Sequence, residues 1–291
     1  MRITENMTLA AARRGQAQAT RRMADASRVA ASGQRVSAPS EDAVAWSTAV
    51  GHEARIQRME ARLRMSDRVT SDLDLAESTL ASAGDLMARA RELAVQGANG
   101  SLDARARADL GREVTDLRSA MISLADTRGA SGYIFGGTRT DAAPFDTLGA
   151  FSGNDVETRA EVADGVTARS NASGARAFTA AGGRDILADL QTLANALTTD
   201  DVLTVRTSIT AMDAGHAQLL SARVETGLGA ERFRSAADVT NNALTNARSA
   251  KASEVEADLP SALTDLTATH AAYERGVAVT RDILQTLSSS R

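Results

Sequence analysis

The feature that most constrains this chain is a regular apolar stripe in residues 258–291. Apolar or aromatic side chains recur there at alternating steps of four and three residues. This average of about 3.5 residues keeps one face of a helix turned toward a partner helix. Nine positions follow the spacing: Leu259, Leu263, Leu266, His270, Tyr273, Val277, Thr280, Leu284 and Leu287. We expect the stripe to be buried against the N-terminal segment of the same chain, another copy or a neighbouring protein.

The composition favours long helices over a thick globular core. Aromatic residues make up only 3% of the 291 residues, and three prolines leave long uninterrupted runs. Such runs, rich in alanine, leucine, arginine and glutamate, favour helix. We therefore predict a mainly α fold. It should consist of long antiparallel helical rods in a coiled-coil bundle, with paired N- and C-terminal helices and a small β-rich insertion.

The chain contains no cysteine, which excludes disulfide bonds and thiol chemistry. No apolar run approaches the roughly 18 residues of a membrane-spanning helix. No signal-peptide-like apolar segment follows Met1. We expect a soluble chain with no membrane insertion, and one that is exported, if at all, without a standard signal sequence.

Positive charge gathers at the N-terminus. Residues 1–35 hold seven arginines and two acidic residues, a balance of +5 that leaves −9 for the remainder. The arginines alternate with alanine, methionine and glutamine, and no aromatic side chain is available to stack on a base. We interpret them as a solvated helix face and expect no nucleic acid partner. Because apolar residues are sparse there, we expect this segment to be mobile until something packs on it.

The first long helices can be placed from their start and stop signals. Ser40 is expected to cap a helix that runs from about residue 43 to 96. Small residues along its seam favour close packing of another helix. Asn99-Gly100 ends this helix, and a second one begins near Asp103. Since the connection is short, the second helix should fold back antiparallel on the first.

The middle of the chain has a different character, with many glycines and polar residues between 129 and 183. Residues 156–162 and 166–172 alternate around Asp164-Gly165, which predicts a β-hairpin. Helices should return at 186–197 and 202–252, the latter with a bend near Gly227 and Gly229. Five aromatic residues are expected to form the core of the β-rich part or to pack it against the helices: Tyr133, Phe135, Phe145, Phe151 and Phe178.

These elements predict three domains. Residues 1–35 and 256–291 should form a terminal coiled-coil domain. Residues 36–131 and 182–255 should form a helical rod domain, and residues 132–181 a small β-rich outer domain.

No pattern of catalytic, cofactor-binding or metal-binding residues was found. His52, His216 and His270 stand far apart in sequence, and none has another ligand at metal-binding spacing. The segment 132–137 (GYIFGG) is rich in glycine but lacks the lysine and serine or threonine of a phosphate-binding loop. We expect a protein that is not an enzyme and uses no cofactor or metal.

Several local motifs resemble the flagellin superfamily. They are residues 1–7 (MRITENM), 35–42 (RVSAPSED) and 90–100 (ARELAVQGANG). Residues 133–141 (YIFGGTRTD), followed by Pro144-Phe145, are most similar to the hook-associated branch of that superfamily. Residues 229–234 (GAERFR) depart from it, because the family commonly has Asn-Arg where Phe233-Arg234 stands.

The resemblance implies a structural protein of the bacterial flagellum that joins the hook to the filament. It implies export through the flagellar type III apparatus with the help of a chaperone, and an extracellular location. It also implies self-assembly into a ring between a neighbouring hook-associated protein and flagellin. The expected assembly residues are Ile3, Met7, Leu259, Leu263, Leu266, Tyr273, Val277, Leu284 and Leu287.

Two alternatives remain open from the sequence. The chain could be a short flagellin that polymerises with its own kind into long filaments. It could also be a cytoplasmic coiled-coil scaffold, which would need neither export nor an outward β-rich insertion.

Overall fold

A computed structural model of the chain describes the backbone of residues 2–289 and the side chains of residues 7–286. The fold is mainly α-helical with two small antiparallel sheets, so the predicted fold class is confirmed. The chain forms two compact units, Met1–Arg58 with Ala243–Arg291, and Met59–Asn242. Each unit is described on its own below.

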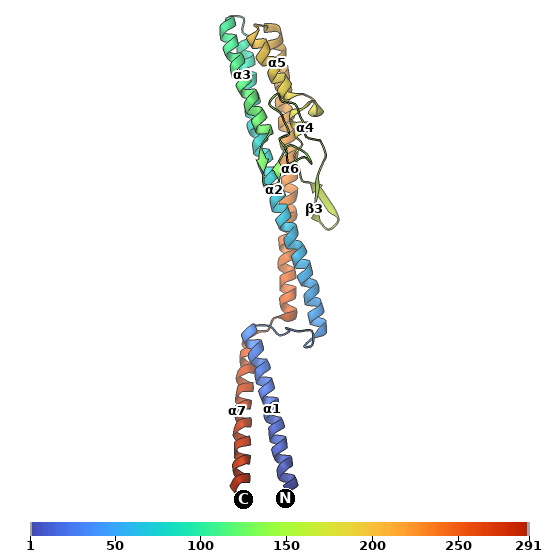
Figure 1. Cartoon of the computed structure of the whole chain (residues 1–291), viewed down its shortest axis with the longest axis vertical. Coiled ribbons are helices and arrows are strands. Elements are labelled where there is room, and N and C mark those ends of the chain that lie inside the picture. Colours follow the sequence, from blue (N-terminus) through green and yellow to red (C-terminus); the bar gives the residue numbers. More distant parts are fainter. Residues whose placement is uncertain (1, 290–291) are drawn as a thin grey trace. The chain divides into compact units, whose positions relative to one another are not determined.

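The first unit is built on the pairing of helix α1 (Arg2–Ser32) with helix α7 (Leu259–Ser289). The two helices lie side by side and run antiparallel, so the N-terminal end of α1 lies beside the C-terminal end of α7 (Figure 1). The unit also contains the first part of α2 (Ala43–Gly97) and the last part of α6 (Val202–Val255).

Two connecting segments, one after α1 and one between α6 and α7, form backbone hydrogen bonds with each other and with the end of α6. The backbone N–H of Arg35 donates to the carbonyl of Val255 at 2.8 Å, and that of Ala257 donates to Gly33 at 2.9 Å. Gly33 adopts φ +67°, which favours glycine where α1 ends. Close by, Val36 and Val255 are buried with Ala45 and Ala49 of α2. These contacts join the end of α1, the start of α2 and the end of α6.

Asp42, rather than Ser40, caps helix α2. The carboxylate of Asp42 accepts hydrogen bonds from the backbone N–H groups of Ala45 (3.0 Å) and Val44 (3.2 Å). Ser40 instead lies in a turn that precedes the cap. The prediction of Ser40 as the cap was therefore wrong by two residues.

The second unit is a bundle of α2, α3 (Ala104–Ala125), α5 (Ile186–Thr198) and α6. Asp103 and Asp185 cap α3 and α5, each accepting a backbone N–H from three residues further on. Alanines and leucines of the four helices share one buried core. Arg89 on α2 pairs with Glu113 on α3 at 2.7 Å, in agreement with the predicted fold-back. Helix α6 continues through Gly227 and Gly229, so the expected bend does not interrupt it.

A β-rich segment lies between α3 and α5. Strands β1 (Arg128–Gly129) and β2 (Gly132–Tyr133) form one short sheet, and β3 (Arg159–Ala163) and β4 (Val166–Arg169) form the other. The second pair is the predicted hairpin, and Gly165 takes φ +74° in its turn. A short helix α4 (Gly174–Phe178) and a 3-10 turn η1 (Ala180–Gly182) lead back to α5.

Aromatic side chains of this segment pack into the core of the helical bundle. Phe135 and Phe178 are fully buried with ring centroids 5.2 Å apart, and Phe145 meets Phe178 at 5.8 Å. All three belong to the same core cluster as leucines of α2 and α5. The segment therefore shares its core with the bundle. The predicted division into three domains remains a prediction.

Across the described residues, no helix is both long and apolar enough to cross a membrane.

Candidate assembly surface

The contact between α1 and α7 has coiled-coil spacing and includes many small side chains. On α1 the less exposed positions recur at steps of three and four: Leu9, Ala12, Gln16, Ala19, Met23, Ala26 and Ala30. On α7 the same spacing gives Ala262, Leu266, Thr269, Tyr273, Gly276, Thr280 and Ile283. Alternating steps of this kind keep two helices in contact along their length. Alanine and glycine allow the backbones to approach closely.

The leucines of the predicted stripe do not all face α1. Leu259, Leu263 and Leu284 expose 51%, 54% and 47% of their surface. Leu266, Tyr273 and Val277 are half-buried. The contact with α1 thus covers one edge of the stripe, and its other edge remains open to solvent.

The predicted set also includes Ile3 and Met7 on α1 and Leu287 on α7. Met7 exposes 66% of its surface, so it too is uncovered within this unit. The side chains of Ile3 and Leu287 lie outside the described residues. The prediction that the whole set acts in assembly remains a prediction. The structure adds that Met7, Leu259, Leu263 and Leu284 are available for it.

The charged residues around this surface are organised at the end of α1. Glu41 accepts hydrogen bonds from the backbone N–H of Ser37 at 2.7 Å and of Ala38 at 3.3 Å. It also pairs with Arg28 at 2.7 Å. The hydrogen bond from Ser37 is the main cause that lowers the pKa of Glu41, and Arg28 adds to it. The motif at residues 35–42 therefore works as a carboxylate-centred connection between α1 and α2.

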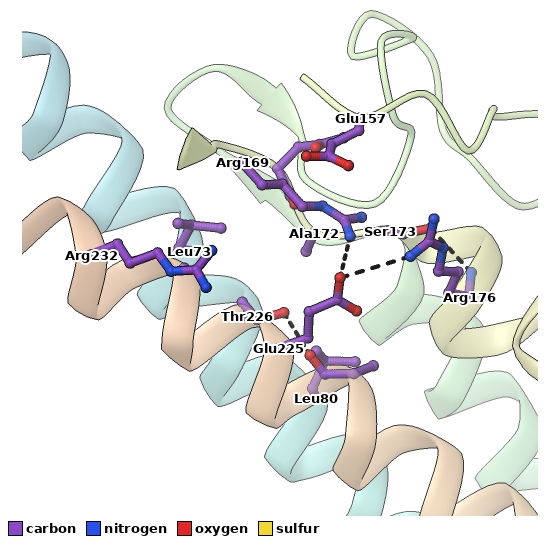
Figure 2. Close-up of a pocket in the computed structure, with 13 residues that line it drawn as sticks. Leu73, Leu80, Glu157, Arg169, Ala172, Ser173, Arg176, Glu225, Thr226 and Arg232 are labelled. Atoms are coloured by element: carbon purple, nitrogen blue, oxygen red, sulfur yellow. Dashed lines mark hydrogen bonds and ion pairs between the residues drawn. The ribbon is translucent and has the colours of Figure 1, made fainter. Parts of the chain in front are cut away.

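A polar pocket in the second unit is lined by charged residues that form ion pairs with one another (Figure 2). Glu225 on α6 pairs with Arg169 at 2.5 Å and lies 3.8 Å from Arg176. Arg176 also contacts Asp155 at 3.2 Å. Burial opposes ionisation of Asp155, but hydrogen bonds from Ser173 and Arg176 outweigh it and lower the pKa of this carboxyl. These pairs attach the β-rich segment to α6.

Neither this pocket nor the histidines form a recognisable reactive centre. Among the described residues, no group of three or more histidine, aspartate or glutamate side chains could hold a metal ion. His270 stands beside Glu274 at 3.7 Å on exposed α7, and His216 lies next to Gly84 in the bundle. The features that stand out are the packed helices and the uncovered apolar edge of α7.

Sequence reasoning missed two parts of this arrangement. It treated residues 1–35 as thinly apolar because it counted only large side chains. The signal that reveals the α1 contact is the three-and-four spacing of its alanines. It also did not predict which edge of the α7 stripe packs on α1. An apolar stripe that is broad enough to contact two partner helices cannot be told from the sequence apart from a stripe that contacts one.

The fold and this surface define the class of protein. It is a mainly α-helical protein whose first and last helices pair in one unit, while its middle forms a second unit. Residues 3–140 match the family described as bacterial flagellin N-terminal helical region.

Curated relatives support a more particular resemblance. Flagellar hook-associated protein 3 of Salmonella typhimurium is 32% identical over 143 residues, covering 48% of this chain and 45% of the relative. The Escherichia coli protein of the same name is 35% identical over 109 residues, or 37% of this chain and 34% of the relative. The aligned part thus spans less than half the length of either relative.

Solved structures agree on the fold. A putative flagellar hook-associated protein from Vibrio parahaemolyticus aligns with TM-score 0.66 at 21% identity, over 74% of this chain and 100% of that chain. The flagellar junction protein FlgL from Legionella pneumophila aligns with TM-score 0.58 at 15% identity, over 72% and 100%. The predicted resemblance to the flagellin superfamily, and within it to hook-associated protein 3, is confirmed.

Proposed function

We propose that this chain is a structural subunit of the bacterial flagellum that joins the hook to the filament. The observation that carries the proposal is the uncovered edge of α7, where Leu259, Leu263 and Leu284 are about half exposed although they continue a coiled-coil pattern. An apolar stripe of this regularity is typical of a surface that another helix covers. The similarity of residues 3–140 to flagellin indicates the kind of assembly.

The occupant of this edge, in our proposal, is the terminal helix pair of a neighbouring subunit. Copies of the chain would form a ring and meet a hook-associated protein on one side and flagellin on the other. Each contact would bury leucines that a single chain leaves exposed, at about 25 cal/mol per Å² of apolar surface removed from water. Assembly therefore supplies a driving force that the isolated chain lacks.

The same proposal includes the route to that position. The chain would leave the cell through the flagellar type III apparatus, with an export chaperone covering the exposed edge of α7 beforehand. A chain without disulfide bonds suits passage in an extended form. We further propose that the protein performs no catalysis and that its role is mechanical.

A paired set of variants tests the proposal. Leu263→Asp combined with Leu284→Asp places two charges on the exposed edge. A buried unpaired charge is strongly unfavourable, so assembly should fail. Ala271→Asp combined with Ala278→Asp adds the same charge to α7 at exposed positions off the stripe. Each double variant should be introduced into a strain that lacks the native protein.

We expect the leucine variant to fold normally, because both leucines are already exposed, and to leave hooks without attached filaments. The alanine variant should support swimming. Circular dichroism of the purified proteins checks folding, and electron microscopy of the flagella checks attachment. Normal filaments with the leucine variant would overturn the proposal. Long filaments formed by the purified protein alone would instead favour a flagellin, and retention in the cytoplasm a scaffold.

A further inference from the structure

The turn between α2 and α3 contains a chemically reactive dipeptide. Asn99 is followed by Gly100, and this is the only Asn-Gly pair in the sequence. Both residues are exposed. The side-chain oxygen of Asn99 accepts hydrogen bonds from the backbone N–H of Ser101 at 3.1 Å and from its hydroxyl at 3.0 Å.

These hydrogen bonds fold the Asn99 side chain back over the following peptide group. The ring closed by the Ser101 N–H contains both Cγ of Asn99 and the backbone nitrogen of Gly100. The two donors also polarise the Cγ carbonyl, which makes its carbon more open to nucleophilic attack. The side chain is therefore oriented and activated toward the nitrogen of Gly100.

The nitrogen of Gly100 is unusually accessible to reaction. Its N–H donates no hydrogen bond within the described part of the chain. A Cβ added at Gly100 would meet nothing within 4 Å, so no neighbour obstructs an approach to this peptide. Glycine itself offers no side chain to hinder the nitrogen.

From this geometry we propose that Asn99-Gly100 is a site of spontaneous deamidation. The nitrogen of Gly100 bonds to Cγ of Asn99 and loses its proton to solvent. The bond from Cγ to Nδ2 breaks, and the amide nitrogen leaves as ammonia, which takes up a proton. The product is a five-membered cyclic imide. A water molecule then opens either of its two carbonyl–nitrogen bonds, giving aspartate or isoaspartate at position 99.

The change acts on a buried guanidinium. Nη2 of Arg107 donates to the main-chain carbonyl of Asn99 at 3.0 Å. In isoaspartate that carbonyl becomes a free carboxylate, and the main chain runs through the former side chain with one extra methylene group. Arg107, which already pairs with Asp200, then faces a second carboxylate. Deamidation thus alters the contacts that hold this end of the bundle.

The chain supplies its own controls for the experiment. Asn171 is followed by Ala172, its Oδ1 accepts the N–H of Thr158 at 3.0 Å, and its Nδ2 donates to Val156 at 3.0 Å. Its amide is held in the fold and should react slowly. Gly100→Ala places a methyl group beside the attacking nitrogen, in open space and without a positive φ at this position.

Full-length wild-type and Gly100→Ala proteins should be incubated at mildly acidic and mildly alkaline pH and then mapped by peptide mass spectrometry with detection of isoaspartate. We expect Asn99 to convert faster than Asn171, more rapidly at alkaline pH, and several-fold more slowly in Gly100→Ala. Conversion of Asn99 no faster than that of Asn171 overturns the proposal. So does an equal rate in the Gly100→Ala protein. Because the readout is chemical, it is independent of hook or filament assembly.

Discussion

Arg107 and Asp200 form an ion pair that ties the turn between α2 and α3 to the turn between α5 and α6. The side chain of Arg107 is only 6% exposed. Its Nε donates to the carbonyl of Gly97 at 2.9 Å, and its Nη2 donates to Asn99. Asp200 reaches the pair from a backbone with φ +60°, uncommon for a residue other than glycine. One guanidinium thus closes one end of the second unit.

Arg107→Ala should therefore destabilise this unit. It leaves the carbonyls of Gly97 and Asn99 without their donor and removes the buried partner of Asp200. Because the carboxylate of Asp200 is about half exposed, most of the cost comes from the two carbonyls that lose their donor, and we expect a loss of about 1–3 kcal/mol. Chemical denaturation followed by far-UV circular dichroism measures the loss.

Arg112→Ala is the matched control, because Arg112 lies on the same helix in an exposed pair with Asp109. Exposed pairs contribute about 0.5 kcal/mol or less, so its unfolding curve should nearly match that of the wild type. If both substitutions lower the free energy of unfolding equally, the buried contacts of Arg107 stabilise the unit no more than an exposed ion pair does.

A second prediction concerns the pH dependence of stability at Asp126. Burial raises the pKa of this carboxyl, although a hydrogen bond from the backbone N–H of Phe145 at 3.0 Å opposes the effect. A carboxyl with a raised pKa in the folded state stabilises the fold only while it is protonated. That contribution is complete below the pKa of the unfolded chain and is lost as pH rises through the folded pKa.

Asp126→Asn keeps an oxygen that can accept from Phe145 but carries no charge. Its free energy of unfolding should exceed that of the wild type at neutral pH. The difference should shrink as pH falls through the raised pKa of Asp126 in the folded state, and it should be smallest below the ordinary pKa of aspartate. Denaturant titrations of both proteins across acidic and neutral pH measure this difference. A gap that is constant with pH, or that widens in acid, contradicts the assignment.

How far the sequence predicted this structure depends on the kind of interaction. Helix limits near Asp103 and Thr198 and the hairpin at Gly165 follow from local preferences, and the structure agrees with them. The pairing of Arg107 with Asp200 joins positions 93 residues apart, and no local pattern indicates it. The spacing of apolar side chains on α7 predicts a broad stripe, but it does not determine which edge of that stripe α1 covers.

The glycines of the second unit allow a third prediction with opposite signs. A Cβ added at Gly111 on α3 would lie 2.7 Å from Oγ1 of Thr198 and 3.0 Å from the carbonyl of Ala194. A Cβ at Gly227 on α6 would meet nothing within 4 Å. Alanine is intrinsically better in helix than glycine by about 1 kcal/mol. Close packing therefore decides the outcome at Gly111 and helix propensity decides it at Gly227.

Gly227→Ala should raise the free energy of unfolding by up to about 1 kcal/mol. Gly111→Ala should lower it, because α3 and α5 must separate to admit the methyl group and overpacking typically costs about 1–3 kcal/mol. Thermal unfolding of the two variants beside the wild type gives the signs directly. Stabilisation by Gly111→Ala would mean that the contact between α3 and α5 is looser than described.

The last prediction tests whether the β-rich segment belongs to the helical core or only decorates it. Phe178 on α4 is fully buried against Phe135 and Phe145 and shares a core cluster with leucines of the bundle. Phe178→Ala should lower the free energy of unfolding by about 3–5 kcal/mol, the usual range for deleting a buried phenylalanine ring. Because the ring touches both parts, the helices and the β-rich segment should unfold in one transition. Phe151→Ala is the control, since Phe151 is only half-buried at the rim of the same cluster and should cost clearly less. Both variants can be followed by circular dichroism for helix content and by hydrogen exchange for the segment. Phe178→Ala could instead speed hydrogen exchange in the segment while the midpoint of the helical transition stays unchanged. That result would show that the segment does not share a core with the bundle.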